Sequence, residues 1–413
     1  MKKIKLGIFG TGARGRTIVI PFLLLGCEVV AICETRAAEL KKAKEKFPDA
    51  AAFSDFDAFI EQDMDAVILA NFFHEHAPYA IRCLERGIHV FSECISNGTM
   101  AEGVELIRAF EKSNAIYMLA ENYPQMLFNR EMKKLCDGGT LGKIIYAEGE
   151  YNHPVDPCDP KFMKNYVYVE NHWRNSLPRT YYLTHSLGPI MHATGATPKR
   201  VTAFSCFIPL DESMPSADQN GDRAAIILTQ NDDGSVFRFG GWSEFGAHAS
   251  SYRLCGTKGQ VENLRGMGNQ VLLRYNEWEI PEGKEEVNLY TPEWNDPDEE
   301  FIKQSGHGGG DYVTARMFVD CIRNGTQPEH PFDIYSAVAM ASVAILGHRS
   351  VLSGGMPYDI PDFRNEEERK KYENDYASPC YSEGKEPTVP CCSHTDYKPT
   401  KEQIALYHEY LKK

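Results

Sequence analysis

Residues 4–15 read IKLGIFGTGARG, a short apolar run that leads into three glycines spaced G-x-G-x-x-G. The run Ile4–Phe9 predicts a buried strand, and the turn that follows it opens a helix. In that context Gly10 permits a tight turn, Gly12 lets the backbone approach a pyrophosphate, and Gly15 allows helix and strand to pack closely. The predicted cofactor contacts of this loop are Gly10, Thr11, Gly12, Ala13, Arg14 and Gly15.

An acidic residue, Glu34, ends the next predicted strand, about twenty residues after the glycine turn, where such a side chain binds ribose hydroxyls. Its charge would repel a 2′-phosphate, which favours NAD over NADP as the cofactor. Arg36, two residues later, could instead accommodate that phosphate. A glycine turn of purely structural use is the alternative, and the strand, helix and acid around it count against that alternative.

The first part of the chain alternates strands with helices, which is typical of a doubly wound α/β domain. The predicted strands are Ile4–Phe9, Glu28–Cys33, Ala66–Ala70, Ile88–Ser92 and Ile116–Ala120. The predicted helices are Thr17–Leu25, Arg36–Lys46, Ala77–Glu85 and Ala101–Ser113.

After about Tyr123, strands follow one another without regular helices between them, which predicts an α+β domain on an open, mostly antiparallel sheet with one face covered. The predicted strands are Lys143–Glu150, Arg200–Phe207, Ala224–Thr229, Val236–Gly240 and Tyr252–Gly256. A long apolar helix, Ile334–Leu352, should pack on that sheet or on the first domain. From Pro357 onward the chain reads as an extended tail that ends in a short helix near Glu402–Leu411. The expected domains are therefore 1–123, 124–355 and a surface extension, 356–413.

The composition excludes several classes of protein. With 44 basic and 58 acidic side chains the formal charge is -14, which argues against nucleic-acid and anionic-membrane partners. A strand follows the first three residues, where a signal peptide would place an apolar core. The 12 cysteines show no paired CxxC motifs and are expected to be reduced thiols of a cytoplasmic protein. Cys391, Cys392 and His394 would chelate a metal poorly because adjacent cysteines give unfavourable geometry, so we expect this segment to be part of a surface tail.

The arrangement resembles the Gfo/Idh/MocA oxidoreductase family over about residues 1–355. The matching stretches are GIFGTGARG, AICETR, HAPYA at His76–Ala80, GIHVFSE at Gly87–Glu93, and LAEN at Leu119–Asn122. The resemblance implies that NAD is the cofactor and that Glu93 and Asn122 lie near both the nicotinamide and a sugar substrate. It also implies that the turn with Asn71 and His76 is the nicotinamide-side loop. His74, Glu75 and His76 fit that loop better than a metal site, so no catalytic metal is expected.

One position departs from the dehydrogenases of the family. They follow the glutamate with lysine and proline, and that lysine polarises the hydroxyl being oxidised. Here the residues are Glu93-Cys94-Ile95, and a cysteine cannot replace an ammonium group.

Further matches look like motifs of NAD-dependent glycosidases, of which α-N-acetylgalactosaminidases of this fold are the nearest group. The matching stretches are Gly149–His153 (GEYNH), Trp173-Arg174, Tyr182–Pro189 (YLTHSLGP) and His307–Asp311 (HGGGD). Members of that subgroup also lack the lysine, and they hydrolyse glycosides through a redox cycle without net oxidation.

The subgroup resemblance implies that Tyr151 and His185 are the acid/base residues. Histidine suits this work because its pKa is near neutrality. A tyrosine acting as a base needs a cationic or hydrogen-bonded neighbour, and His153, Arg174 or the nicotinamide could serve. A space-filling tyrosine and a core histidine are the structural alternatives. The predicted substrate contacts are Glu93, Asn122, Trp173, Arg174, Tyr182 and His307.

Three functions stay open at this stage. The first is a glycoside hydrolase that recycles NAD and acts on a small-molecule glycoside. The family resemblance also implies a homo-oligomer. The second is a sugar or inositol dehydrogenase that releases NADH, and the missing lysine counts against it. The third is a sugar-binding or regulatory protein on the same fold in which catalysis has been lost, and the retention of Tyr151 and His185 counts against that one.

Overall fold

The computed structural model describes residues 3–159, 172–382 and 385–412. The chain separates into two compact units, each assembled from several segments. The N-terminal unit comprises Met1–Arg130, Glu293–Ala341 and Phe363–Asn374. The sheet unit comprises Glu131–Pro292, Ser342–Asp362 and Asp375–Lys413. The domain boundaries expected at residues 123 and 355 stay a prediction. Each compact unit is assembled from segments that alternate along the chain with segments of the other unit.

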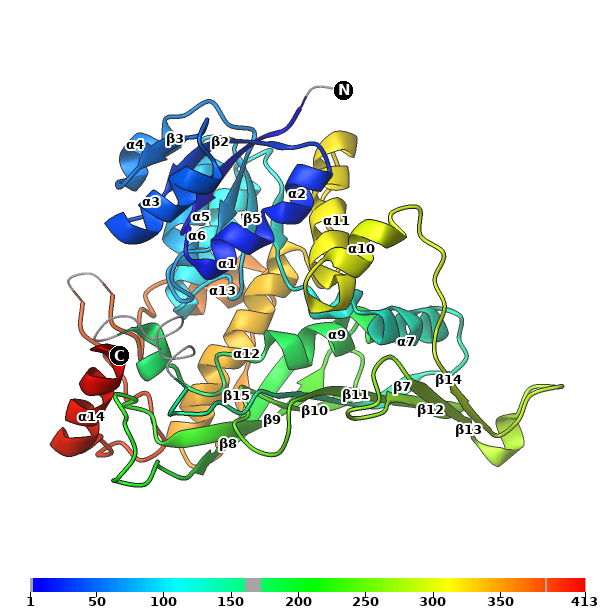
Figure 1. Cartoon of the computed structure of the whole chain (residues 1–413). Coiled ribbons are helices and arrows are strands. Elements are labelled where there is room, and N and C mark those ends of the chain that lie inside the picture. Colours follow the sequence, from blue (N-terminus) through cyan, green and yellow to red (C-terminus); the bar gives the residue numbers. More distant parts are fainter. Residues whose placement is uncertain (1–2, 160–171, 383–384, 413) are drawn as a thin grey trace. The chain divides into compact units, whose positions relative to one another are not determined.

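The N-terminal unit contains a six-stranded parallel sheet in the order β3-β2-β1-β4-β5-β6 (Figure 1). The order reverses at β1 and β4, which is the switch point where open α/β sheets bind ligands. Its strands are β1 (Lys5–Phe9), β2 (Glu28–Cys33), β3 (Ala51–Phe53), β4 (Ala66–Leu69), β5 (His89–Ser92) and β6 (Tyr117–Leu119). Its first helices are α1 (Ala13–Ile18), α2 (Ile20–Leu24), α3 (Ala37–Lys46), α4 (Phe56–Ile60), α5 (His76–Glu85) and α6 (Met100–Glu111).

The five strands predicted here are confirmed to within a residue, and the Rossmann fold is confirmed. The single helix predicted over Thr17–Leu25 is wrong in its start and continuity. The structure has α1 beginning directly after Gly12, a break at Val19, and then α2. Pro21 has no backbone N–H to donate to the preceding turn, which explains why one continuous helix does not form.

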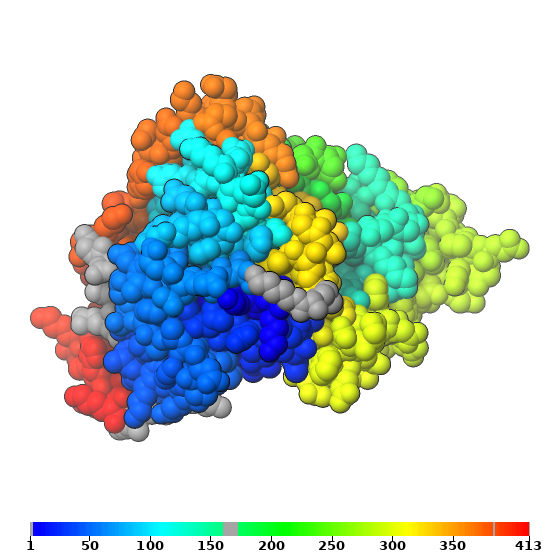
Figure 2. Space-filling model, turned by 90° about the horizontal axis from the view of Figure 1, so that it is seen from above, coloured from blue at the N-terminus to red at the C-terminus, as the bar shows by residue number. Residues whose placement is uncertain are grey.

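Later segments of the chain complete the N-terminal unit. The Phe318 ring of α11 (Gly310–Asn324) lies 6.2 Å from Phe22 and 5.2 Å from Phe91, centroid to centroid, inside the apolar core. Arg369 bonds Glu111 of α6, and Figure 2 shows the orange surface of this late segment beside the cyan surface of α6. The remaining elements of this unit are η1 (Tyr123–Gln125), α10 (Glu299–Gln304), η4 (His307–Gly309), α13 (Glu366–Arg369) and η5 (Lys370–Tyr372).

The sheet unit contains a nine-stranded sheet in the order β14-β13-β12-β11-β7-β10-β9-β8-β15. All its ladders are antiparallel except the central β7–β10 pair, so the predicted mostly antiparallel sheet is confirmed. The strands are β7 (Ile144–Asn152), β8 (Pro198–Phe207), β9 (Asp222–Asn231), β10 (Val236–Gly240), β11 (Ala249–Gly256), β12 (Gly259–Asn263), β13 (Val271–Tyr275), β14 (Val287–Tyr290) and β15 (Tyr358–Asp359). The turns η2 (Trp173–Asn175) and η3 (Glu277–Glu279) also belong to this unit.

A regular helix, α9 (Thr184–Thr194), packs on β7, β10 and β11. The expectation of no helix between the strands of this region is therefore wrong. Gly188 and Pro189 lie inside α9, and both residues weaken a helical signal in the sequence. On the face of the sheet away from α9, Phe204, Ile226 and Leu228 are exposed. The expected homo-oligomer stays a prediction.

Two helices cross or approach the division between the units. α7 (Leu127–Asp137) and α12 (Ile334–Leu352) each contribute residues to both. Within the sheet unit the Ser350 hydroxyl of α12 accepts a hydrogen bond from the backbone of Ala203, which confirms that this helix packs on the sheet. By length and composition α12 could cross a membrane, but 83% of the apolar window is buried in the structure, as in a core helix.

The last part of the chain contains short elements joined by extended stretches. Within the sheet unit, Ser393 donates to Asp222, and the Gln403 side chain donates to the backbone of Asp211. The terminal helix α14 (Lys401–Lys412) confirms the short helix predicted there, and its Tyr407 is buried. All 12 cysteines lie among the described residues, and none forms a disulfide.

Candidate active site

The glycine turn leaves room for a pyrophosphate at one position only. Gly10 has φ +86°, and a Cβ there would collide with the backbone of Ala70 and Asn71. A Cβ on Gly15 would collide with the carbonyl of Gly10, so this glycine closes the helix onto the strand. A Cβ on Gly12 would meet only the Arg36 guanidinium, at 3.1 Å. The loop is therefore crowded on the protein side and open at Gly12, as a dinucleotide cradle requires.

Glu34 occupies the expected position at the end of β2 and is buried. Its carboxylate accepts hydrogen bonds from the Arg36 backbone at 3.1 Å and from Arg36 Nε and Nη2 at 3.0 and 3.1 Å. A bidentate Arg–carboxylate pair orients both groups. Ribose hydroxyls would meet an acid whose charge is already balanced, so the preference for NAD over NADP stays a prediction that Arg36 would moderate.

Arg14 joins two parts of the N-terminal unit in one ionic network. Its Nε bonds Glu93 Oε1 at 2.5 Å, and its two terminal nitrogens bond Asp311 at 3.0 and 3.1 Å. Asp311 also accepts from Asn122 Nδ2 at 2.6 Å and lies 3.0 Å from His307 Nδ1. The structure thus brings together Arg14, Asn122 and His307 around Asp311, whose role was not foreseen, and Arg14 joins Glu93 to them.

Electrostatics keep Asp311 ionised. Burial on its own would raise the pKa of Asp311, but the hydrogen bond with His307 and the charge of Arg14 outweigh it. They hold the pKa of that carboxyl well below its usual range. The network therefore places the charge of Asp311 against Arg14, which also bonds Glu93.

The glycine-rich turn before α11 has a packing purpose. His307, Gly308 and Gly309 all have positive φ, and a Cβ on Gly310 would collide with the Asn122 carbonyl. This turn lets Asp311 reach Asn122 with His307 beside it, because Gly308 and Gly309 adopt left-handed backbone angles easily and Gly310 has no Cβ to block the close approach. The His307 ring also lies 5.8 Å from the Tyr123 ring.

Cys94 and Ile95, which stand where the dehydrogenases that the sequence resembles have lysine and proline, are held by hydrogen bonds to His76 and Glu121. His76 is fully buried, its Nδ1 lies 2.8 Å from the Ile95 carbonyl, and burial lowers its pKa, so it is a neutral donor. The Cys94 thiol donates to Glu121 Oε2 at 3.3 Å. Nearby, Asn71 Nδ2 donates to the Glu75 carbonyl at 3.1 Å. His76 and Asn71 therefore shape this loop, and Cys94 lies against a carboxylate that sequence reasoning did not single out.

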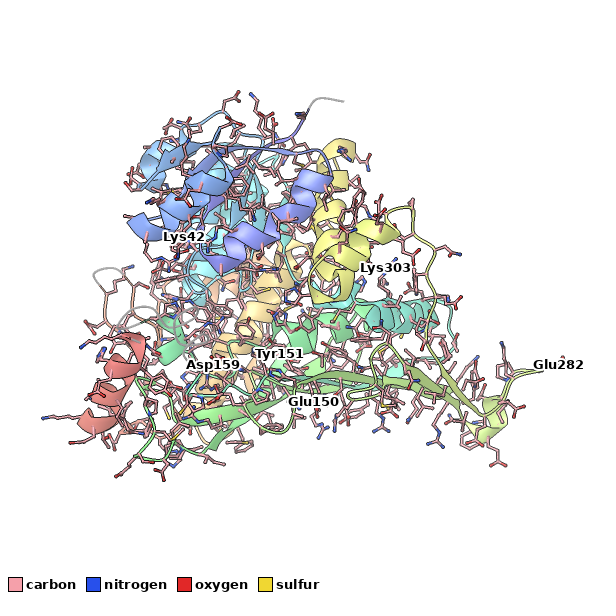
Figure 3. All side chains as sticks on the ribbon, viewed as in Figure 1. Lys42, Glu150, Tyr151, Asp159, Glu282 and Lys303 are labelled. Carbon is pink, nitrogen blue, oxygen red and sulfur yellow. The ribbon has the colours of Figure 1, made fainter. Side chains whose placement is uncertain are left out.

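In the sheet unit, Tyr151 of β7 meets His185 near the start of α9. Their ring centroids are 4.9 Å apart at 71°. A Cβ on Gly149 would collide with the Ser186 carbonyl, so this glycine is what lets α9 approach β7. The Tyr252 hydroxyl donates to the His185 carbonyl at 2.5 Å and fixes the helix there. Figure 3 shows Tyr151 and Glu150 on opposite faces of the sheet, as alternation along a strand dictates.

Aromatic rings and one cation surround this pair. Tyr182 lies 5.8 Å from Tyr151 and 5.4 Å from His185, and Trp242 lies 5.7 Å from Tyr182. The Arg174 guanidinium lies over Trp173 at 4.3 Å, Trp242 at 5.3 Å and Tyr182 at 5.8 Å. We call these side chains the aromatic cluster: Tyr151, His153, Trp173, Arg174, Tyr182, His185 and Trp242.

His153 stacks on Tyr151 with centroids 5.5 Å apart, and its Nδ1 lies 3.2 Å from His248 Nδ1. Burial, together with the nearby charges of His248 and Arg174, lowers the pKa of His153 to about 4. His153 is therefore neutral at pH 7 and does not supply the cation that a basic tyrosine needs. Arg174 is the arginine of the aromatic cluster and can supply that cation.

The sequence motifs contained most of these residues but not their partners. Asp311 was visible as the end of HGGGD, and Trp242 as the residue after the two glycines at the end of β10. Neither signal says what the side chain contacts. Among residues 3–159, 172–382 and 385–412, no group of three His, Cys, Asp or Glu side chains could hold a metal ion.

Two family models match separate parts of this chain. Residues 4–121 match the family model described as oxidoreductase family, NAD-binding Rossmann fold, and residues 247–370 match that of glycosyl hydrolase 109, C-terminal domain. A glycosyl hydrolase family 109 protein of Streptomyces filamentosus is 26% identical over 416 residues, which cover 89% of this chain and 78% of the relative. One of Porphyromonas gingivalis is 25% identical over 406 residues, covering 88% and 85%.

Solved structures share the fold at lower identity. Levoglucosan dehydrogenase in complex with NADH and L-sorbose superposes with a TM-score of 0.73 at 18% identity, covering 88% of this chain and all of that one. The myo-inositol 2-dehydrogenase of Lactobacillus plantarum gives 0.66 at 19%, covering 87% and 100%. The chain is therefore an NAD-dependent enzyme whose residues 4–121 match the Rossmann-fold model of the Gfo/Idh/MocA oxidoreductases and whose residues 247–370 match the C-terminal domain model of glycosyl hydrolase 109.

Proposed function

We propose that this enzyme is a glycoside hydrolase that oxidises C3 of its sugar transiently and restores it before release. The observation that carries the proposal is the contact of Tyr151 with His185, which Gly149 makes possible. Two neighbouring groups that can exchange protons suit a reaction with two separate deprotonations of one sugar. The family 109 relatives support the same class of activity.

NAD fits the open side of the loop at Gly12, with Gly10–Gly15 and Glu34 as its predicted contacts. When bound, it supplies reversible hydride acceptance and ends each turnover in its starting oxidation state. Glu93 and Asn122, linked through Arg14 and Asp311, are the predicted contacts of the nicotinamide side and of the sugar. A rigid ionic network would hold both side chains in one geometry.

The proposed proton transfers fall to two side chains. His185 takes the proton of the C3 hydroxyl as that carbon becomes a ketone. The ketone acidifies the hydrogen on C2, and Tyr151 removes it, while Arg174 stabilises negative charge in the surrounding ring system. The aglycone then leaves C1 with its bonding electrons. Water adds to C1, Tyr151 returns a proton to C2, and His185 returns one to the C3 oxygen.

Cys94 distinguishes this proposal from the second candidate, a sugar or inositol dehydrogenase with net NADH release. A neutral thiol bonded to Glu121 offers no positive charge at the position where dehydrogenases of the family keep lysine. The route also needs no pair of carboxylates flanking the glycosidic bond, unlike common glycosidases.

The test is turnover of a panel of aryl glycosides by the purified chain, with and without NAD. We expect aglycone release that depends on NAD, no accumulation of NADH, and deuterium at C2 of the sugar after reaction in D₂O. Tyr151→Phe and His185→Ala should each lose roughly a hundredfold to ten-thousandfold in rate. Stoichiometric NADH with the glycosidic bond intact would establish the dehydrogenase instead.

A further inference from the structure

Two histidines lie side by side where β7 ends and β11 begins. The antiparallel register pairs Asn152 with Ala249, so its continuation places His153 opposite His248. Residues directly opposite one another in such a ladder project from the same face of the sheet. The two Nδ1 atoms are 3.2 Å apart, and the ring centroids are 4.7 Å apart. The sheet therefore holds the two imidazoles within hydrogen-bond distance of each other.

The loop between β10 and β11, which carries His248, is bound to the end of β7 by hydrogen bonds. The backbone N–H of His153 donates to the Ser243 carbonyl at 2.8 Å. The indole Nε1 of Trp242 donates to the His153 carbonyl at 3.1 Å. Both bonds join His153 to the loop that ends at His248, so the two histidines are fixed relative to each other.

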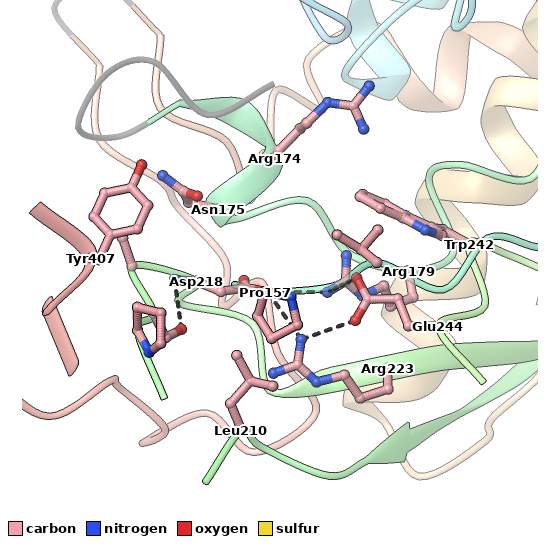
Figure 4. A pocket seen from close by; sticks show the side chains of 14 residues that line it. Pro157, Arg174, Asn175, Arg179, Leu210, Asp218, Arg223, Trp242, Glu244 and Tyr407 are labelled. Atoms are coloured by element: carbon pink, nitrogen blue, oxygen red, sulfur yellow. Dashed lines mark hydrogen bonds and ion pairs between the residues drawn. The ribbon is translucent and has the colours of Figure 1, made fainter. Parts of the chain in front are cut away.

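Ion pairs anchor the same loop to the rest of the sheet unit. Glu244 Oε1 lies 3.2 Å from Arg179 Nη2, and Glu244 Oε2 lies 3.0 Å from Arg223 Nη1. Figure 4 shows these pairs as dashed lines. Because Arg179 is only 1% exposed, its pair with Glu244 is shielded from solvent. The position of His248 therefore follows from a loop that is held at several points.

The histidine pair extends from solvent to the predicted acid/base residues Tyr151 and His185. His248 is exposed, whereas His153 is partly buried. The His153 ring stacks on the Tyr151 ring with centroids 5.5 Å apart and an interplanar angle of 12°. Tyr151 in turn meets His185 at 4.9 Å. One end of the histidine pair therefore faces solvent, and the other end lies against the acid/base pair.

Two imidazoles in contact can pass a proton along, because each ring takes a proton at one nitrogen and releases one from the other. Burial, together with the charges of His248 and Arg174, lowers the pKa of His153 to about 4, so its ring is neutral at pH 7 and has one nitrogen without a proton. Of the two facing Nδ1 atoms, one carries the hydrogen and the other accepts it. The two Nε2 atoms are then the entry and the exit of a two-ring chain.

We propose that His153 and His248 form a proton relay between solvent and the acid/base pair. The identity of the proton rests on the proposed function, in which Tyr151 takes it from C2 of the sugar. The proton passes through one bridging water to Nε2 of His153. The Nδ1 proton of His153 passes to Nδ1 of His248, and the Nε2 proton of His248 leaves to solvent. When C2 is reprotonated the same transfers run in reverse, so both rings regain their starting tautomers and no proton is gained or lost.

The test is the isotope content of the sugar released from an aryl glycoside in D₂O. In the parent enzyme the relay replaces the proton on Tyr151 with deuterium, so we expect most of the sugar to carry deuterium at C2. His248→Ala interrupts the relay at its exposed end, and exchange with solvent should slow about a hundredfold, the contribution of a positioned acid/base group. The sugar should then keep protium at C2, because Tyr151 returns the proton that it took. Proton NMR of the sugar measures this content.

Two further variants assign the effect to the relay. His153→Phe keeps a ring against Tyr151 but has no nitrogen, and it should cause the same loss of deuterium. His408→Ala removes an exposed histidine of α14 and should leave the deuterium content unchanged. Free imidazole should restore deuterium in His248→Ala, because that position is open to solvent. Deuterium at the parent level in His248→Ala without added imidazole would overturn the proposal, and it decides the question even if His153→Phe does not fold.

The relay and the proposed function fail in different ways. Stoichiometric NADH with the glycosidic bond intact in the parent would refute the proposed function. The relay would then carry the hydroxyl proton that net oxidation releases from the sugar. A pH indicator in a stopped-flow experiment should show slower proton release in His248→Ala than in His408→Ala. Equal rates of proton release in these two variants would overturn the relay in that case as well.

Discussion

Asp311→Asn tests whether the ionic network around Arg14 holds the N-terminal unit together. The carboxylate accepts from both terminal nitrogens of Arg14 and from Asn122, and it lies within hydrogen-bond distance of His307. An asparagine keeps the shape but replaces one acceptor oxygen with a donor, which would then face another donor. Arg14 would keep only Glu93 as a charged partner.

The magnitude follows from burial. Breaking one side of a buried ion pair costs about 3–5 kcal/mol. The Asp311 side chain is 8% exposed but that of Arg14 is 32% exposed, so solvent screening brings the expectation to about 3 kcal/mol. For a unit of this size each kcal/mol shifts the melting temperature by about 2–4 °C, which predicts a loss of about 6–12 °C.

Differential scanning calorimetry of the NAD-free protein at pH 7 measures this loss. Asp359→Asn, in an exposed pair with Arg200, is the matched control and should shift the melting temperature by less than about 2 °C. Because the folded pKa of Asp311 is depressed, its stabilisation is present above its ordinary pKa and is lost as the pH falls toward the folded value. The gap between parent and Asp311→Asn should therefore narrow from pH 7 to pH 3. A melting temperature unchanged within 2 °C at pH 7 refutes the reasoning.

Three further predictions concern single positions. The enzyme should bind NAD about a hundredfold more tightly than NADP. Glu34→Gln should reduce this ratio of affinities, because Arg36 then loses its carboxylate partner and can meet a 2′-phosphate. Calorimetric titration with both cofactors measures the ratio, and equal affinities in the parent enzyme would show that Glu34 does not select NAD. Cys94→Ala should leave turnover of a good substrate within about tenfold, under ~1.4 kcal/mol of barrier, and a loss of several orders of magnitude in kcat would show the thiol to be essential. Gly149→Ala should lower the free energy of unfolding of the sheet unit by about 1–3 kcal/mol in denaturant unfolding and should slow turnover. The reason is that a Cβ at position 149 meets the carbonyl of Ser186, the residue after His185. An unchanged free energy of unfolding would contradict the packing argument.

Local chemistry explains what could be predicted from sequence. The strand, glycine turn and Glu34 follow one another within a short stretch, and each has a conformational requirement that few residues meet. The five strands of the N-terminal sheet are short apolar runs because parallel strands are buried on both faces. The helix predictions failed where proline or glycine lies inside a helical segment. Pro21 separates α1 from α2, which were predicted as one helix, and Gly188 and Pro189 weaken the helical pattern of α9, which was not predicted.

Side-chain partners distant in the sequence were decided by the tertiary structure alone. Asp311 meets Arg14 across 297 positions, and α11 adds Phe318 to the core of a unit whose sheet ends before residue 120. Arg179 and Arg223 form ion pairs with Asp218 and Glu244, and these residues come from three stretches with no shared motif. No periodicity or spacing encodes such contacts, because they arise only when separate segments are packed to satisfy buried charge. The sequence determined which residues could do chemistry, and packing determined which of them act together.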